Sequence, residues 1–240
     1  MARINNRIDS KFIDLTSSGK EKKKKEHSLP PRNGTEANLI LDRLWERNPI
    51  LALTCQMSAL TGLRYSDASW LKFSDFYDEF GAFKTSFKLC QQKTFNMRIG
   101  SKNPLSPPDA FRKSVVTIYT NSDIQEIVEQ CKVFNPNSEY LFANKRSALK
   151  DSDSNVIDRP MSTESASWHH AIVRKELELP YVLGTHSWRK YFAKLLIQHG
   201  ATPEKVRDLL GQNSLESTNL YLHTVEEELV PLINNISLNL

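Results

Sequence analysis

The sequence predicts a mainly α-helical protein with one small antiparallel β-sheet, an α+β fold. Apolar residues recur at spacings of three and four at the beginning and in the final third of the chain, which indicates helices. Two short runs near the middle instead alternate apolar and polar residues, as half-buried strands do. The composition, 39% hydrophobic and 25% charged over 240 residues, is ordinary for a globular protein.

The first helices are predicted from capping residues and helix breakers. Thr35 can cap a helix that Pro49 ends, because proline disrupts a helix interior. A second, apolar helix is expected over about 50–60, where a Thr-Gly pair at 61–62 breaks it. Ser66 can cap a further short helix after this break.

The middle of the chain alternates strand signals with loop signals. Residues 83–94 and 114–120 are the two strand-like runs. Three prolines predict an extended loop between them, over 96–113. A helix is expected over 122–131, and the polar stretch 144–163 is expected to be another loop.

The C-terminal third carries a series of helix signals. An apolar stripe at helical spacing runs through 188–196. Thr202, followed by proline and glutamate, is a strong helix start, and Gly211 suits the end of that helix. Ser214 can cap the next helix, which would carry Tyr221.

Positive charge is concentrated at the N-terminus. Residues 1–35 hold nine Lys or Arg and four Asp or Glu, a net of +5, so the other 205 residues carry −1 of the total of +4. We expect residues 1–34 to form a flexible basic arm, which is either a solvated tail or a segment that binds phosphate groups in a salt-dependent manner. Its densest run contains Lys22, Lys23, Lys24 and Lys25.

Several functional classes are disfavoured by what the sequence lacks. Cys55, Cys90 and Cys131 are far apart, so a disulfide framework or a zinc site is not expected. No phosphate-cradling glycine-rich loop and no carboxylate cluster occurs, so we expect neither a metal nor another cofactor. No apolar run suits a membrane span or a signal peptide, which predicts a cytoplasmic protein.

Three short motifs carry the chemistry. They are TGLRYSD at 61–67, HSWR at 186–189 and LLGQNS at 209–214, the last followed by Tyr221. Each motif alone is common, but their order and separation resemble the catalytic domain of the tyrosine recombinases, the phage integrase family. In that family an arginine follows a Thr-Gly-Leu turn and a lysine lies on a β-hairpin. A His-x-x-Arg pair, a Leu-Gly-His turn and a tyrosine follow.

The resemblance covers about residues 35–223 and implies a tyrosine recombinase catalytic domain over 35–225. Arg64 and Arg189 would bind the phosphate, because guanidinium groups meet its oxygens bidentately. Tyr221 would be the nucleophile. His186 would assist proton transfer, since its ordinary pKa lies near neutrality.

Two further roles are implied with less specific motifs. Lys93, within Gln91-Gln92-Lys93-Thr94, would be the hairpin lysine that protonates the leaving 5′ oxygen, with Lys102 and Lys113 as rivals. Asp67 would orient the site. Lys190, which directly follows the second motif, is expected to bind DNA together with the arm lysines.

The sequence departs from the family pattern in two places. Gln212 stands where the family usually has histidine or tryptophan, and an amide can donate a hydrogen bond but cannot shuttle a proton. Residues 1–35 are also too short and too polar for the family's usual DNA-clamping domain. In this the chain resembles minimal members such as the fimbrial-switch invertases.

The implied activity is site-specific DNA breakage and rejoining through a 3′-phosphotyrosyl intermediate, in the bacterial cytoplasm and associated with the nucleoid. Its partners would be a double-stranded recombination site, further copies of the chain as a dimer to tetramer, and accessory DNA-bending proteins. The apolar tail 226–240 would dock on a neighbouring protomer or on its own body. Two alternatives remain: an inactive DNA-binding homologue that regulates recombination, and a topoisomerase-like relaxing enzyme.

Overall fold

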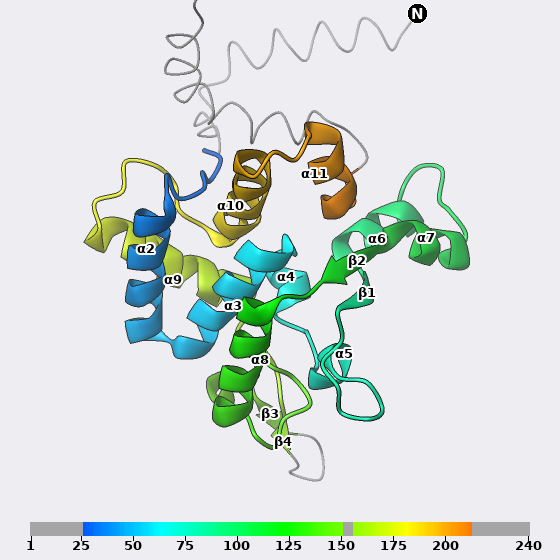
Figure 1. The fold of residues 1–240 in the computed structure, drawn as a ribbon, viewed down its shortest axis with the longest axis horizontal. Coiled ribbons are helices and arrows are strands. Elements are labelled where there is room, and N and C mark those ends of the chain that lie inside the picture. The colour runs from blue at the N-terminus through cyan, green and yellow to red at the C-terminus, as the bar shows by residue number, and fades with distance from the viewer. Residues whose placement is uncertain (1–25, 151–155, 213–240) are drawn as a thin grey trace, which may run out of the picture.

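The computed structural model describes residues 26–150 and 156–212. In chain order the elements are α2 (Gly34–Arg47), α3 (Pro49–Thr61), α4 (Tyr65–Ala68), α5 (Phe73–Phe76), β1 (Ser86–Cys90), α6 (Gln92–Ile99), α7 (Pro107–Ser114), β2 (Val115–Tyr119), α8 (Ser122–Phe134), the 3-10 turn η1 (Lys145–Ser147), β3 (Leu149–Lys150), β4 (Val156–Ile157), α9 (Thr163–Glu176), α10 (Thr185–Gln198) and α11 (Pro203–Leu210). Within these ranges the strands form small antiparallel pairs among many helices (Figure 1). The predicted fold class is confirmed.

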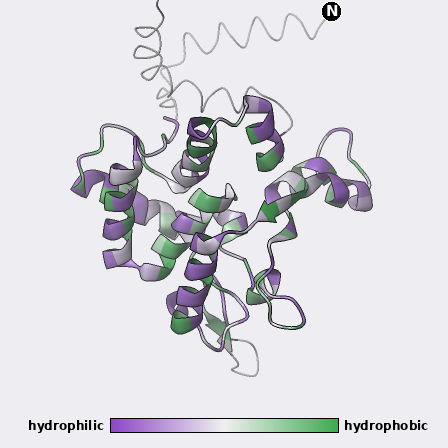
Figure 2. Cartoon of the chain, in the orientation of Figure 1, coloured by the Kyte–Doolittle hydropathy of each residue, from purple (hydrophilic) through white to green (hydrophobic). Residues whose placement is uncertain are grey.

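Helix α3 lies between the two larger hydrophobic cores of the described residues. Nine of its thirteen residues are buried, which agrees with the apolar helix predicted over about 50–60. Helices α2, α9 and α10 pack around one side of it, where Trp188 is fully buried. The hairpin β1–β2 and helix α8 pack on the other side (Figures 1 and 2). A smaller core joins α10 to α11.

A buried histidine holds α9, α10 and α3 together. Nδ1 of His170 lies 2.7 Å from the carbonyl oxygen of Ala166, and Nε2 accepts a hydrogen bond of 2.9 Å from Nε1 of Trp188. The Sγ atom of Cys55 lies 3.6 Å from the same Nε2. Burial lowers the pKa of His170 to about 4, so its imidazole is neutral at neutral pH.

Two local expectations about helix starts need correction. The cap of α2 is Asn33, whose side chain accepts from the backbone N–H of Glu36, and Thr35 lies inside the helix. Ser66 likewise lies inside α4, which begins directly after Arg64. Pro49 follows the end of α2, as predicted, and is itself the first residue of α3, where a missing N–H costs nothing.

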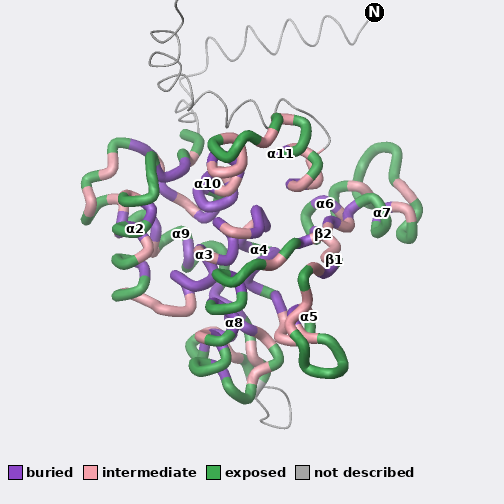
Figure 3. The backbone as a smooth tube through the Cα atoms, in the orientation of Figure 1, coloured by how far each residue is buried: buried purple, intermediate pink, exposed green. Residues whose placement is uncertain are grey.

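The hairpin β1–β2 was predicted, but the segment between its strands was not. Ser86 pairs with Tyr119 and Cys90 with Val115, in antiparallel register. The extended loop expected over 96–113 is wrong, because this segment forms most of α6 and α7. We call residues 92–114 the lobe. It projects from the side of the body, and its surface is largely exposed (Figures 1 and 3).

Two further segments complete the description. The stretch 144–163 was expected to be a loop, but its described residues include η1 and the antiparallel pair β3–β4. Residues 28–33 lie against α10, where Pro30 and Pro31 are buried and the backbone N–H of Leu29 donates to Val182. No helix within the described ranges is long and apolar enough to cross a membrane.

Candidate DNA-processing site

The first motif forms a tight turn that delivers Arg64 to the surface between α3 and α4. Gly62 ends α3 with a φ of 69°, a left-handed conformation that favours glycine. A Cβ atom at this position would lie 2.5 Å from the ring of Phe192, so the helix end and α10 require glycine here. The Ser58 hydroxyl donates to the carbonyl of Leu63 at 2.6 Å and fixes the turn.

The side chain of Arg64 is held by the end of the hairpin. Its guanidinium donates to Oε1 of Gln91 and, at 3.4 Å, to Oγ1 of Thr94. It also lies 3.9 Å from a carboxylate oxygen of Asp67. With 17% of its side chain exposed, Arg64 is ordered by the protein while part of it still faces solvent.

Asp67 connects α4 to the start of the lobe. Its Oδ1 accepts a hydrogen bond of 3.0 Å from the backbone N–H of Gln92, at the positive end of α6. Burial raises the pKa of Asp67, while this N–H and the nearby Arg64 and Arg189 act in the opposite direction. Its Oδ2 is buried and accepts no hydrogen bond from the described residues. This placement suits the orienting role expected for Asp67.

Arg189 links all three motifs. It is 2% exposed, and its guanidinium donates to the carbonyl oxygens of Gly62 at 2.5 Å and Leu210 at 2.9 Å. The side-chain amide of Gln91 donates to the same Leu210 oxygen at 3.1 Å. The first motif, the hairpin end and the third motif therefore meet at one arginine on the second motif.

His186 lies in the first turn of α10, next to this junction. Its side chain is exposed, yet surrounding protein atoms desolvate the ring in part, and this burial is the main cause that lowers its pKa to about 4. Four positive charges add to the effect, in the order Lys93, Arg189, Arg64 and Lys190. At neutral pH His186 is therefore a neutral imidazole in a positive environment.

Lys93 was expected on a β-hairpin and instead lies in the first turn of α6. It is exposed and borders a surface pocket together with Asp67, Trp70 and Cys90. Its charge acts on His186 more than that of any other residue does, so it lies beside the junction. Its rivals are elsewhere in the lobe: Lys102 lies between α6 and α7 and Lys113 near the end of α7.

The third motif turns sharply after α11, as predicted. Thr202 caps this helix and Gly211 ends it with a φ of 62°. A Cβ atom on Gly211 would lie 2.6 Å from Val116 of the hairpin, so a larger residue would push the two elements apart. Gln212 follows at once, with its backbone N–H bonded to the Arg207 carbonyl at 3.0 Å.

The remaining predicted residues divide into two groups. Tyr221 and the arm lysines Lys22, Lys23, Lys24 and Lys25 lie outside the described residues. The ammonium of Lys190 donates to the carbonyl of Ser28, and burial lowers its pKa, so it anchors the segment before α2. Contact between these lysines and DNA stays a prediction.

Gln91 and Thr94 are polar residues of the site that sequence reasoning missed. Gln91 is 1% exposed and bonds both to Arg64 and to the Leu210 carbonyl. The two residues flank Lys93 in a polar stretch whose sequence gives no sign of burial. Contact with the Leu210 carbonyl of α11 holds Gln91 inside, and Thr94 lies within hydrogen-bond distance of Gln91 and Arg64.

The fold and this junction define a helical domain in which three positive side chains, Arg64, Lys93 and Arg189, surround the neutral imidazole of His186. Planar guanidinium groups beside a neutral imidazole and an exposed ammonium can bind a phosphate and exchange protons with it. Within the described ranges, no three His, Cys, Asp or Glu side chains gather as a metal site would require.

Comparison with known proteins identifies the family of this chain. The model of the phage integrase family matches residues 36–228. The match covers most of the chain, so this protein belongs to the phage integrase family, the tyrosine recombinases. Its matched segment corresponds to the family's catalytic domain.

Two bacterial relatives show how far the likeness extends. The chain is 31% identical over 133 residues to tyrosine recombinase XerD of Bifidobacterium longum, which covers 55% of this chain and 39% of that protein. It is 25% identical over 199 residues to tyrosine recombinase XerC of Oceanobacillus iheyensis, covering 79% of this chain and 56% of that protein. The matches thus span about half of each relative's length or less.

Solved structures share the fold. The crystal structure of XerA recombinase matches with a TM-score of 0.60 at 14% identity and covers 89% of this chain and 68% of that chain. A lambda integrase dimer bound to a COC′ core site matches with a TM-score of 0.57 at 19% identity, covering 87% and 63%.

Proposed function

We propose that this protein is a site-specific DNA recombinase that breaks and rejoins DNA through Tyr221. The observation that carries the proposal is the convergence of Arg64, Lys93, His186 and Arg189 from three separate segments on one junction. Nucleophilic attack on a phosphodiester builds negative charge on the non-bridging oxygens, and such a cluster stabilises that charge. The family membership supports the same chemistry.

The reaction we propose is a pair of transesterifications. The phenol oxygen of Tyr221 bonds to phosphorus, and the bond from phosphorus to the 5′ oxygen breaks, which leaves a 3′-phosphotyrosyl link. The free 5′-hydroxyl of a partner strand then attacks this link and releases the tyrosine. The number of phosphate ester bonds is conserved, so the exchange needs no nucleotide hydrolysis.

His186 and Lys93 would move the protons. A free phenol has a pKa of about 10, so Tyr221 needs an acceptor for its proton at pH 7. The lowered pKa of His186 keeps its imidazole neutral and able to accept a proton. Lys93, exposed beside it, would protonate the leaving 5′ oxygen, and Asp67 would position α6 and hence Lys93.

The partners follow from the same proposal. Double-stranded DNA would be the substrate, and strand exchange requires at least two copies of the chain on DNA. The lambda integrase structure that shares this fold is a dimer bound to a core site. Phosphate contacts carry no sequence information, so the target sequence needs its own experiment.

The test is covalent trapping on nicked duplexes, from which the leaving strand dissociates after cleavage so that the adduct accumulates. The duplexes are prepared as a pool in which the central sequence is randomised. Adduct is detected by gel shift under denaturing conditions. Tyr221→Phe should abolish it, because phenylalanine has no atom that can attack. Arg189→Ala should form adduct about 100-fold to 1000-fold more slowly, because it keeps the nucleophile but removes charge stabilisation.

An inactive DNA-binding homologue is the second candidate, and Gln212 is the observation that favours it. Its amide can hydrogen-bond a phosphate oxygen but cannot carry a proton. DNA binding without any adduct from the unaltered protein would select this candidate. Adduct from Tyr221→Phe would instead refute the assignment of the nucleophile.

A further inference from the structure

We propose that the lobe, residues 92–114, is a second DNA-backbone contact surface that grips the duplex beside the cleavage point. This inference rests on the proposed function and concerns how the same site holds its substrate. The lobe carries five Lys or Arg and one Asp, a net charge of +4. Residues 36–240 together carry −1, so the rest of that range carries −5.

The lobe is anchored to the site at its base. The backbone N–H of Gln92 donates to Asp67, and the N–H of Gln91 donates to the Ser114 carbonyl at 2.9 Å. Arg98 reaches from α6 to the end of α7, where it donates to the Lys113 carbonyl and, at 2.7 Å, to the Ser114 hydroxyl. The start of α6 and the end of α7 therefore both lie at the catalytic junction.

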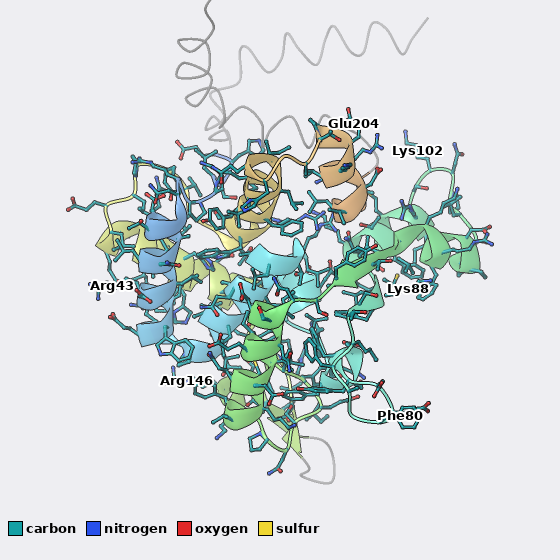
Figure 4. All side chains as sticks on the ribbon, in the orientation of Figure 1. Arg43, Phe80, Lys88, Lys102, Arg146 and Glu204 are labelled. Atoms are coloured by element: carbon teal, nitrogen blue, oxygen red, sulfur yellow. The ribbon has the colours of Figure 1, made fainter. Side chains whose placement is uncertain are left out.

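The cations of the lobe have two different uses. Arg98 stabilises the lobe itself, and Arg112 forms an ion pair with Asp109. The side chains of Lys102 and Lys113 are exposed, and their ammonium groups form no hydrogen bond or salt bridge with any described residue. Lys102 lies on the outer loop, residues 100–106 between α6 and α7, and extends away from the body (Figure 4). These two lysines are placed to meet an anionic partner.

The dimensions suit a duplex that crosses the site. Helix α6 has eight residues, which gives a length of about 12 Å from Lys93 towards the outer loop. B-DNA rises about 3.4 Å per base pair, so this length corresponds to roughly four base pairs. A duplex whose scissile phosphate lies at the junction would place further phosphates along the lobe.

The test is the salt dependence of binding to a 40-base-pair duplex, because the slope of log K against log salt falls by about 0.9 for each phosphate that the protein stops binding. Lys102→Gln/Lys113→Gln should lower this slope by about 1.8. The unaltered protein would then lose roughly tenfold more affinity than the variant between 50 and 200 mM salt. Lys132→Gln/Lys175→Gln removes the same charge outside the lobe and should keep the slope.

The outcomes separate this inference from the proposed function. Equal slopes for the two double variants, with adduct formed by the unaltered protein, would overturn the inference alone. A lowered slope only in the lobe variant, with no adduct from the unaltered protein, would support the inference and remove the recombinase proposal.

A second copy of the chain is the alternative partner for this surface, because the apolar side chains of Met97 and Phe111 are more than half exposed on the lobe. If the lobe variant no longer self-associated and its slope stayed unchanged, this surface would belong to a second copy and the inference would be overturned.

Discussion

At the scale of single residues, His186 responds to the charges that surround it. Among the charges that lower the pKa of His186, that of Lys93 has the largest effect. Lys93→Gln removes a positive charge that disfavours the imidazolium, so the pKa of His186 should rise above about 4 towards 6.5. The measurement is an NMR titration of the histidine ring signals, with His186→Gln to assign the peak.

The same titration distinguishes Lys93 from its rivals. Lys113→Gln removes an equal charge from the lobe, and Lys113 does not contribute to the shift at His186. The His186 titration should therefore stay unchanged in this control. If the pKa of His186 rose equally in both variants, the shift would come from the summed charge of the lobe. Lys93 would then not be supported as the neighbour of His186.

Residues could be predicted from the sequence where a local motif fixes them. Arg64 follows a Gly62 turn and His186 lies three residues before Arg189, so their placement depends on local geometry that the motifs carry. Gln91 shows no such pattern, because its burial arises from contact with α11, more than 100 residues away. For Gln91, tertiary packing and not a local motif decides that it enters the site.

At the scale of elements, local signals predicted some helices and concealed others. Helix α11 was found because Thr202 and Gly211 mark both of its ends. The sequence of the lobe predicts a loop because prolines count as breakers. Pro107 and Pro108 in fact occupy the first turn of α7, where proline is tolerated, and Ser106 caps it. The position of proline within a helix decides its effect.

Gly211 makes a prediction about the junction of α11 with the hairpin. Gly211→Ala introduces both a left-handed strain and a contact of 2.6 Å with Val116. Gly200→Ala is a matched control, since its φ is 84° and nothing lies within 4 Å of its Cβ position. The control should lower the free energy of unfolding by about 1 kcal/mol, the cost of the conformation alone.

Gly211→Ala should cost about 1–3 kcal/mol more than Gly200→Ala, because the contact forces a shift in a packed core. Denaturant unfolding of the two variants measures the difference. Equal costs would show that the hairpin and α11 separate easily, and the link through the Leu210 carbonyl would then contribute little to the site.

At the scale of the whole molecule, the buried His170 makes stability depend on pH. Its folded pKa is about 4 and its ordinary value is 6.5, so the unfolded chain binds the proton first. Its contribution is complete above pH 6.5 and is lost as the pH falls towards 4. The shift corresponds to about 3 kcal/mol over this window.

A comparison of unfolding free energies between pH 6.5 and pH 4 isolates this group. His170→Gln cannot take up the proton, so its stability should fall less steeply over this window than that of the unaltered protein, even if its absolute stability is lower. Carboxylates titrate equally in both proteins. Identical slopes would place the pH dependence elsewhere, with His186 as the next candidate.

The arrangement of the cores could not be read from composition, because it depends on which faces of α3 meet which partners. Composition also does not show where the N-terminal arm joins the body. Ser28, next to the start of α10, accepts a hydrogen bond from Lys190, four residues after His186. Ser28 therefore lies near the junction of Arg64, His186 and Arg189. Residues 1–25, which precede the described range, carry the whole net charge of +5 of the first 35 residues.

Deletion of residues 1–25 tests whether this charge reaches DNA. The deletion keeps residues 28–33, which Lys190 and Lys194 hold against the body, so the fold should be retained. Binding to a duplex should weaken, and the salt slope should fall by about 0.9 for every phosphate that the arm binds in the unaltered protein. Replacing Lys22, Lys23, Lys24 and Lys25 by glutamine should reproduce most of this change if the lysine run binds those phosphates. An unchanged slope in both variants would show that the arm does not touch DNA, and the lobe would then supply the basic surface beside the site.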